Sequence, residues 1–154
     1  HYEVAAHLGR EKLANMPGLN EFTAAMEKVF IAADPDGLAL FAAYKSMPLA
    51  EDTPARAMQL AVSLREFRGS AHLIAIRSVG LTSKQAHYVK RPNDVKNFGW
   101  GEDDAPLVDD QVRALMVQAE NLTDALCIPA YAVLNDAERK ALVDGAKAFE
   151  AALK

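Results

Sequence analysis

Apolar residues recur along this chain at intervals of three and four positions, the spacing that gathers side chains on one face of an α-helix. The longest such stripe comprises Leu60, Leu64, Phe67, Ala71 and Ile74. Strict alternation of apolar and polar positions, which would indicate β-strands, is scarce. The pattern predicts an all-α protein, a compact bundle of about seven helices over residues 2–15, 19–33, 38–47, 53–79, 83–90, 109–134 and 137–153.

Residues typical of helix ends separate these stripes. Thr53 is expected to cap the fourth helix with Pro54 at its first position, and Asn135 is expected to cap the last helix. Gly80 is expected to end the fourth helix in a left-handed conformation. Pro129 is expected to kink or split the helix over 109–134, because proline lacks an amide donor and clashes with the preceding turn. In the terminal helix the predicted inward positions are Leu142, Ala146 and Phe149.

Length and composition fit one globular domain. Of the 154 residues, 51% are hydrophobic and 25% are charged, which allows a core to be buried. No apolar run approaches the roughly 20 residues of a membrane span, and the N-terminus carries no secretory signal. The single Cys127 lies among apolar residues, so a buried, inert thiol and a cytoplasmic location are expected. We expect one helical domain over 1–154 without membrane contact. The sequence starts at His1 rather than Met, and we interpret the chain as a processed form or as the C-terminal part of a longer protein.

The stretch from residue 71 to residue 90 has the order helix, tight turn, helix. The turn is Gly80-Leu81-Thr82, in which glycine supplies the left-handed position and threonine caps the second helix. The amide, imidazole and cationic groups that follow suit base edges and phosphates. The candidate DNA-binding residues are therefore Lys84, Gln85, His87, Lys90 and Arg91. Many helical bundles contain the same turn, so a plain helical corner stays open as the alternative.

The charge balance opposes a nucleic-acid partner. The formal net charge is −4, whereas compact DNA-binding domains are generally basic, because neutralisation of phosphates provides most of the affinity. A local basic patch and an acidic run follow one another closely along the chain. The patch consists of Lys84, His87, Lys90, Arg91 and Lys96, and the run is Glu102-Asp103-Asp104. DNA is thus a partner that the motif favours and the charge balance disfavours.

A second polar cluster lies in the middle of the fourth predicted helix. Arg68 and His72 share one helical face, Glu66 points elsewhere, and Gly69 occupies a helix-interior position where glycine often permits close approach of another group. One interpretation is a ligand pocket, in which Arg68 binds an anion, His72 donates or transfers a proton, Glu66 orients a partner, and Trp100 adds a contact. The alternative is an internal ion pair that fixes helix packing, because burying unpaired charges is costly.

The sequence carries no signature of catalysis or of a bound cofactor. It contains no recognisable nucleophile–base pair, no metal-ligand spacing around its histidines and no phosphate-binding loop. We therefore expect no cofactor and no metal, and a binding role rather than an enzymatic one.

The segment LREFRGSAHLIAIRSVGL at residues 64–81, followed by Gly99-Trp100, is similar to an actinobacterial helix-turn-helix family related to the MarR-type winged-helix regulators. Residues 121–134 are similar to the terminal helical pair of that family, so the resemblance extends over residues 19–153. The resemblance implies a fold more than an activity. After Trp100, an acidic segment stands where the family has a further helix and a wing that would read DNA, so no recognition helix is carried over to any residue.

Three functions remain in view. The first is a MarR-like or degenerate helix-turn-helix protein acting as a small-molecule-responsive transcriptional regulator, with a homodimer formed through its terminal helices. The second is a helical ligand-binding or enzymatic domain with a polar pocket around Arg68 and His72. The third is a protein-interaction module whose apolar helix faces dock on a partner chain. The sequence favours the first of these.

Overall fold

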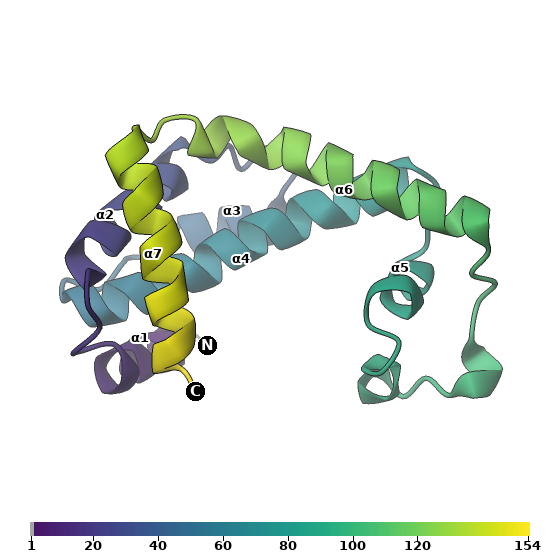
Figure 1. The fold of residues 1–154 in the computed structure, drawn as a ribbon, viewed down its shortest axis with the longest axis horizontal. Helices are drawn as coiled ribbons and strands as arrows, with labels where there is room; N and C mark the ends of the chain where they lie inside the picture. The colour runs from purple at the N-terminus through teal and green to yellow at the C-terminus, as the bar shows by residue number, and fades with distance from the viewer. Residues whose placement is uncertain (1) are drawn as a thin grey trace. The chain divides into compact units, whose positions relative to one another are not determined.

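The computed structural model describes residues 2–154, which form seven α-helices, two short 3-10 helices and no β-strand (Figure 1). The α-helices are α1 (Tyr2–Lys12), α2 (Leu19–Ala32), α3 (Ala39–Lys45), α4 (Thr53–Ser78), α5 (Ser83–Lys90), α6 (Asp110–Tyr131) and α7 (Asp136–Ala152). The 3-10 helices are η1 (Val95–Phe98) and η2 (Glu102–Asp104). The predicted all-α fold is confirmed. No helix among the described residues has both the length and the apolar character needed to cross a membrane.

The chain divides into two units, each with its own internal packing. The first unit comprises the residues up to Arg68 together with Cys127–Lys154, and the second unit comprises Gly69–Leu126. The helices α4 and α6 are continuous, and each of them has one part in the first unit and one part in the second.

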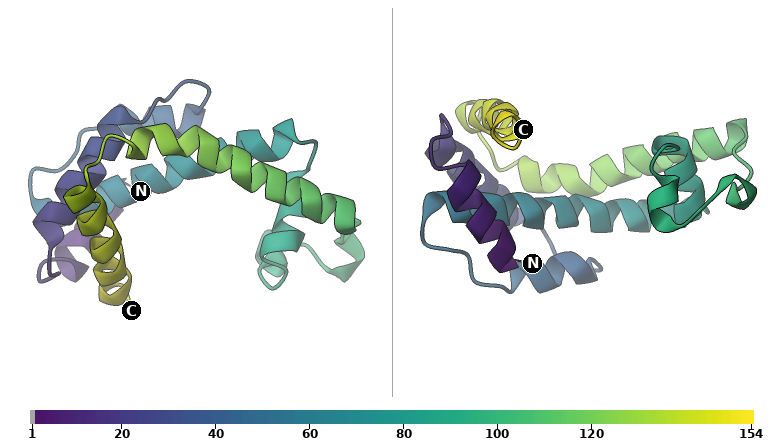
Figure 2. Two further views of the ribbon diagram at one scale, coloured as in Figure 1. Left: turned by 45° about the horizontal axis from the view of Figure 1, so that its top comes forward. Right: turned by 90° about the horizontal axis from the view of Figure 1, so that it is seen from below.

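In the first unit, α7 packs against α2, and the two helices lie side by side in both views of Figure 2. The contact depends on a glycine: a Cβ atom at Gly145 of α7 would overlap the ring of Phe22 on α2. One turn later, the ring of Phe149 lies 5.9 Å from that of Phe22. The prediction that Ala146 faces inward is wrong, because Ala146 is exposed and Gly145 takes the buried position beside the phenylalanine.

A second close approach joins α1 to the start of α4. A Cβ atom at Gly9 would overlap the carbonyl oxygen of Pro54. Nearby, the hydroxyl of Tyr2 lies 3.2 Å from Oγ of Ser63, and burial raises the pKa of the Tyr2 phenol. Small residues therefore set the spacing of the helices in this unit.

Side-chain caps define the helix starts. At α4 the cap is Asp52 rather than the predicted Thr53, since Oδ1 of Asp52 accepts the amide of Ala55 at 3.2 Å. Asp52 also accepts hydrogen bonds from Arg10 of α1, which lowers the pKa of its carboxyl group. At α7 the predicted cap Asn135 is confirmed, and its amide hydrogen-bonds the side chain of the residue three positions later in a capping box.

The buried stripe of α4 follows the prediction as far as Ala71, which is fully buried. Beyond that point Ile74 is 38% exposed, and Ala75 and Ile76 are buried instead. The reason is that α5 and α6 cover α4 in the second unit, so the buried side is set by different neighbours.

Two predictions concern the end of α6. Cys127 is buried, as predicted. The helix is not divided at Pro129; it extends to Tyr131, and the amide of Ala132 still donates to the carbonyl of Ile128 at 3.0 Å. Proline removes a single hydrogen bond of the helix, and the hydrogen bonds on its C-terminal side continue.

Candidate functional site

The second unit contains the predicted helix, turn and helix, formed by the end of α4, residues 79–82 and α5. Gly80 has a φ of 85°, in the left-handed region that favours glycine. The amide of Leu81 donates to the carbonyl of Ile76 at 3.0 Å, and the amide of Gly80 donates to that of Arg77 at 3.2 Å. These two bonds form a Schellman C-cap, so local backbone bonding fixes the direction in which the chain leaves α4.

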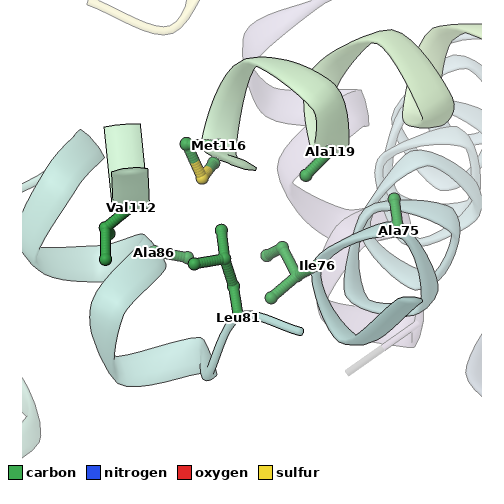
Figure 3. Packing of buried hydrophobic residues seen from close by; sticks show 7 residues of the cluster. All are labelled: Ala75, Ile76, Leu81, Ala86, Val112, Met116 and Ala119. Atoms are coloured by element: carbon green, nitrogen blue, oxygen red, sulfur yellow. The ribbon is translucent and has the colours of Figure 1, made fainter. Parts of the chain in front are cut away.

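The turn is anchored in a small core by Leu81, which is 1% exposed. In Figure 3 its side chain points into the space between α4, α5 and α6. Fully burying a leucine contributes roughly 1.5–3 kcal/mol, and here that contribution depends on all three helices being in place. The buried members of this core are Ala75, Ile76, Leu81, Ala86, Val112, Met116 and Ala119.

The start of α5 is closed by a reciprocal cap. The amide of Gln85 donates to Oγ1 of Thr82 at 3.1 Å, and the amide of Thr82 donates to Oε1 of Gln85 at 3.0 Å. The predicted cap at Thr82 is confirmed. Because Oε1 of Gln85 accepts the amide of Thr82, only the side-chain NH₂ of Gln85 is available to contact a base edge.

Aromatic residues of α5 and of the segment after it form one cluster, which consists of His87, Tyr88, Phe98 and Trp100. The indole ring of Trp100 lies 5.1 Å from the ring of Phe98 and 6.3 Å from that of Tyr88, and both pairs are nearly parallel. The ring of His87 meets those of Phe98 and Trp100 edge-on, at 4.6 and 5.8 Å. The structure therefore places Trp100 in this aromatic cluster, against α5.

Polar contacts also tie this segment to α5. Nζ of Lys84 lies 3.4 Å from Oδ1 of Asp104 and 5.4 Å from the centroid of the Trp100 ring. The hydroxyl of Tyr88 donates to the carbonyl of Gly101 at 2.8 Å. The other oxygen of Asp104 accepts the Gly101 amide at 3.0 Å. That backbone hydrogen bond, together with the charge of Lys84, lowers the pKa of the Asp104 carboxyl group.

The cations at the C-terminal end of α5 differ in their surroundings. Lys90 pairs with Glu120 of α6 at 2.8 Å, and its side chain is 51% exposed. Arg91 and Lys96 are exposed, and neither forms an ion pair with any residue that the structure describes. Of the predicted basic patch, these two residues are the cations most available to a partner.

The polar residues in the middle of α4 belong to different units. Glu66 and Arg68 lie in the first unit, where Glu66 pairs with the neighbouring Arg65. Arg68 is exposed, and its charge acts on the phenol of Tyr131, whose pKa is nevertheless raised because burial outweighs that effect. Gly69 is exposed, and the close approach of another group at this position stays a prediction.

His72 lies in the second unit, and its ring is held by α6. Nδ1 of His72 lies 2.9 Å from Oγ1 of Thr123, a fully buried hydroxyl. That hydroxyl donates its one proton to the carbonyl of Ala119 at 2.7 Å. Nδ1 of His72 must therefore carry the proton of the bond to Thr123. A common ligand pocket of Glu66, Arg68, His72 and Trp100 stays a prediction.

Sequence reasoning missed the groups that hold these residues in place. Asp104 was interpreted only as part of an acidic run, and Thr123 lay on a stretch analysed for its apolar positions. No local signal identifies either role, because Asp104 contacts Lys84 and Thr123 contacts His72 across wide separations in the chain. Only Tyr88 had a recognisable signal, since an aromatic residue four positions from Lys84 shares its face of the helix.

Comparison with known proteins agrees with the geometry of the second unit. A family model described as a helix-turn-helix family matches residues 1–154. Neither a curated protein nor a solved structure matches the chain significantly.

Proposed function

This chain belongs to a helix-turn-helix family, and from that premise we propose that it is a transcriptional regulator whose second unit binds duplex DNA. In this proposal α5 faces the groove, while Arg91, Lys96 and Lys90, which also pairs with Glu120, contact the phosphates. The eight residues of α5 span about 12 Å, a length that fits within the major groove.

The observation that carries the proposal is the hydrogen-bonded and capped turn between α4 and α5. Its left-handed Gly80 and its buried Leu81 hold α5 at a fixed angle on α4 and α6. A recognition helix needs such a rigid support, because its side chains must reach base edges in one register. The exposed Arg91 directly follows this helix and the exposed Lys96 lies in η1, and both add local positive charge to a chain whose net charge is −4.

The net charge predicts how such binding behaves. A protein with a negative net charge gains little from long-range attraction to DNA, so the affinity depends on a few local phosphate contacts. Each contact releases counterions, and the affinity therefore falls steeply as salt increases.

The test is a titration of fluorescent mixed-sequence duplex DNA with the full chain at low and moderate salt, followed by anisotropy. Arg91→Ala and Lys96→Ala are each expected to weaken binding and to reduce the slope of log affinity against log salt by about one. Lys147→Ala is the matched control, because it removes an exposed cation of the first unit. Absence of binding at low salt, or an equal effect of all three variants, contradicts the proposal.

The proposal includes a response to a small-molecule anion at His72 of the second unit. The supporting observation is that His72 is half-buried with its Nδ1 proton directed to a buried hydroxyl, an arrangement that holds the imidazole ring in one orientation. Benzoate serves as a probe: it is expected to raise the thermal midpoint of the chain, and His72→Ala is expected to abolish that rise. An equal rise in both proteins would contradict a ligand site at His72.

The MarR-type relation and a homodimer through the terminal helices are further parts of the proposal. The exposed Val143 of α7 and Leu153, which caps the C-terminal end of α7, support the dimer, since apolar side chains at the surface gain from being covered. Sedimentation velocity of the full chain tests it, and a monomer at all concentrations would contradict it.

A further inference from the structure

The outward face of α5 is covered by the segment that follows it. Successive helical residues are about 100° apart, so Lys84, His87 and Tyr88 share one face of α5. The buried Ala86 and the half-buried Val89 lie on the opposite side, which packs on the core. The first three residues therefore point away from the core, in the direction from which a nucleic acid would approach.

Residues 98–104, named here the covering segment, contact each of these outward side chains. Asp104 pairs with Lys84, and the carbonyl of Gly101 accepts the hydroxyl of Tyr88 at 2.8 Å. The Lys84 ammonium lies over the face of the Trp100 indole, which also stacks beside the ring of Tyr88. The donors on this face are thus already engaged by acceptors of the same chain.

We infer that the covering segment is an autoinhibitory element, which occupies on α5 the positions that duplex DNA takes when it binds. The carboxylate of Asp104 stands where a phosphate oxygen accepts from Lys84, and the Gly101 carbonyl stands where an acceptor of DNA meets Tyr88. This inference rests on the proposed function, since it concerns the regulation of the same surface.

The strength of these contacts suits a displaceable element. The Asp104 side chain is 51% exposed and the Lys84 side chain 32% exposed, so water and salt screen their attraction. An exposed ion pair shifts an equilibrium by about two- to fivefold. Only molecules with an open segment bind DNA, so the apparent affinity is proportional to the open fraction. Weakening the closed state raises that fraction, and with it the affinity for DNA, by about two- to fivefold.

Two adjacent carboxylates provide a matched experiment. Asp104→Asn removes one negative charge and weakens the contact with Lys84, whereas Asp103→Asn removes the same charge from a neighbouring exposed side chain. Both substitutions lower the overall electrostatic repulsion between the protein and DNA by the same amount. We expect Asp104→Asn to bind the duplex about two- to fivefold more tightly than Asp103→Asn does.

Trp100 gives an independent readout, because it is the single tryptophan of the chain. Opening of the covering segment exposes the indole and shifts its emission to the red. We expect this shift in Asp104→Asn without DNA, no shift in Asp103→Asn, and a shift of the wild-type chain when duplex DNA is added. Tyr88→Phe, which keeps the ring and removes the hydroxyl, is expected to act in the same direction as Asp104→Asn.

The outcomes separate the two proposals. An equal gain in affinity for both asparagine variants, or an unchanged emission in Asp104→Asn and Tyr88→Phe, overturns autoinhibition and leaves DNA binding in place. If the wild-type chain and all variants fail to bind duplex DNA at low salt, both the proposed function and the inference are overturned.

Discussion

Gly145 of α7 lies directly against the ring of Phe22 on α2, so that any side chain at this position would overlap the ring. We expect Gly145→Ala to lower the free energy of unfolding. Overpacking costs about 1–3 kcal/mol, which exceeds the gain of about 1 kcal/mol that alanine brings to a helix interior. Urea unfolding followed by circular dichroism measures the difference.

The control for this substitution is Ala146→Gly, one position further along α7 and exposed. It isolates the helix-propensity effect and is expected to cost about 0.5–1 kcal/mol. If Gly145→Ala raised the stability by the propensity gain alone, the close approach of α7 to Phe22 would be wrong.

Leu81→Ala is expected to destabilise the second unit by about 2–5 kcal/mol, because it leaves a cavity where three helices meet. The matched change Leu107→Ala, at a leucine that is 74% exposed, is expected to stay within about 0.5 kcal/mol. Hydrogen exchange resolves the effect by region, and protection in α5 should fall in Leu81→Ala. Equal effects of the two substitutions would contradict the anchoring role of the turn.

The helices and their ends were largely predictable because the signals for them are local. The cap at Asn135 and the turn at Gly80 each depend on residues within six positions along the chain. Thr53 was misassigned because Asp52, one position earlier, is also a capping residue, and its additional contact with Arg10 of α1 is not visible in the sequence. Local chemistry alone does not decide between two adjacent caps.

The candidate site was predictable only in part, because its contacts are between distant positions. The turn that supports α5 was correctly located from Gly80 and Thr82. The structure places the Trp100 ring against α5, and the predicted grouping of Trp100 with Arg68 and His72 stays a prediction. A loop of ordinary composition gives no periodic signal that states which helix it covers.

Thr123→Val is expected to cost about 1–3 kcal/mol, because it leaves the Nδ1 proton of His72 without its hydroxyl acceptor. Thr123→Ser keeps the hydroxyl and should recover most of the loss. Long-range ¹H–¹⁵N spectra of the wild-type chain should show His72 protonated at Nδ1. A neutral His72 protonated at Nε2 alone would contradict the hydrogen-bond order derived from Thr123 and Ala119.

The contact of Asp104 with the Gly101 amide and with Lys84 predicts a pH dependence. These contacts hold the pKa of the Asp104 carboxyl group below its ordinary value of 3.8. Because the folded-state pKa is depressed, the stabilisation of the covering segment is fully present above pH 3.8 and is lost as the pH falls through the folded-state value. We expect the Trp100 emission to shift to the red only below pH 3.8, while far-UV circular dichroism confirms that the helices persist. Asp104→Asn should lack this transition, and the same acid transition in both proteins would show that another group releases the segment.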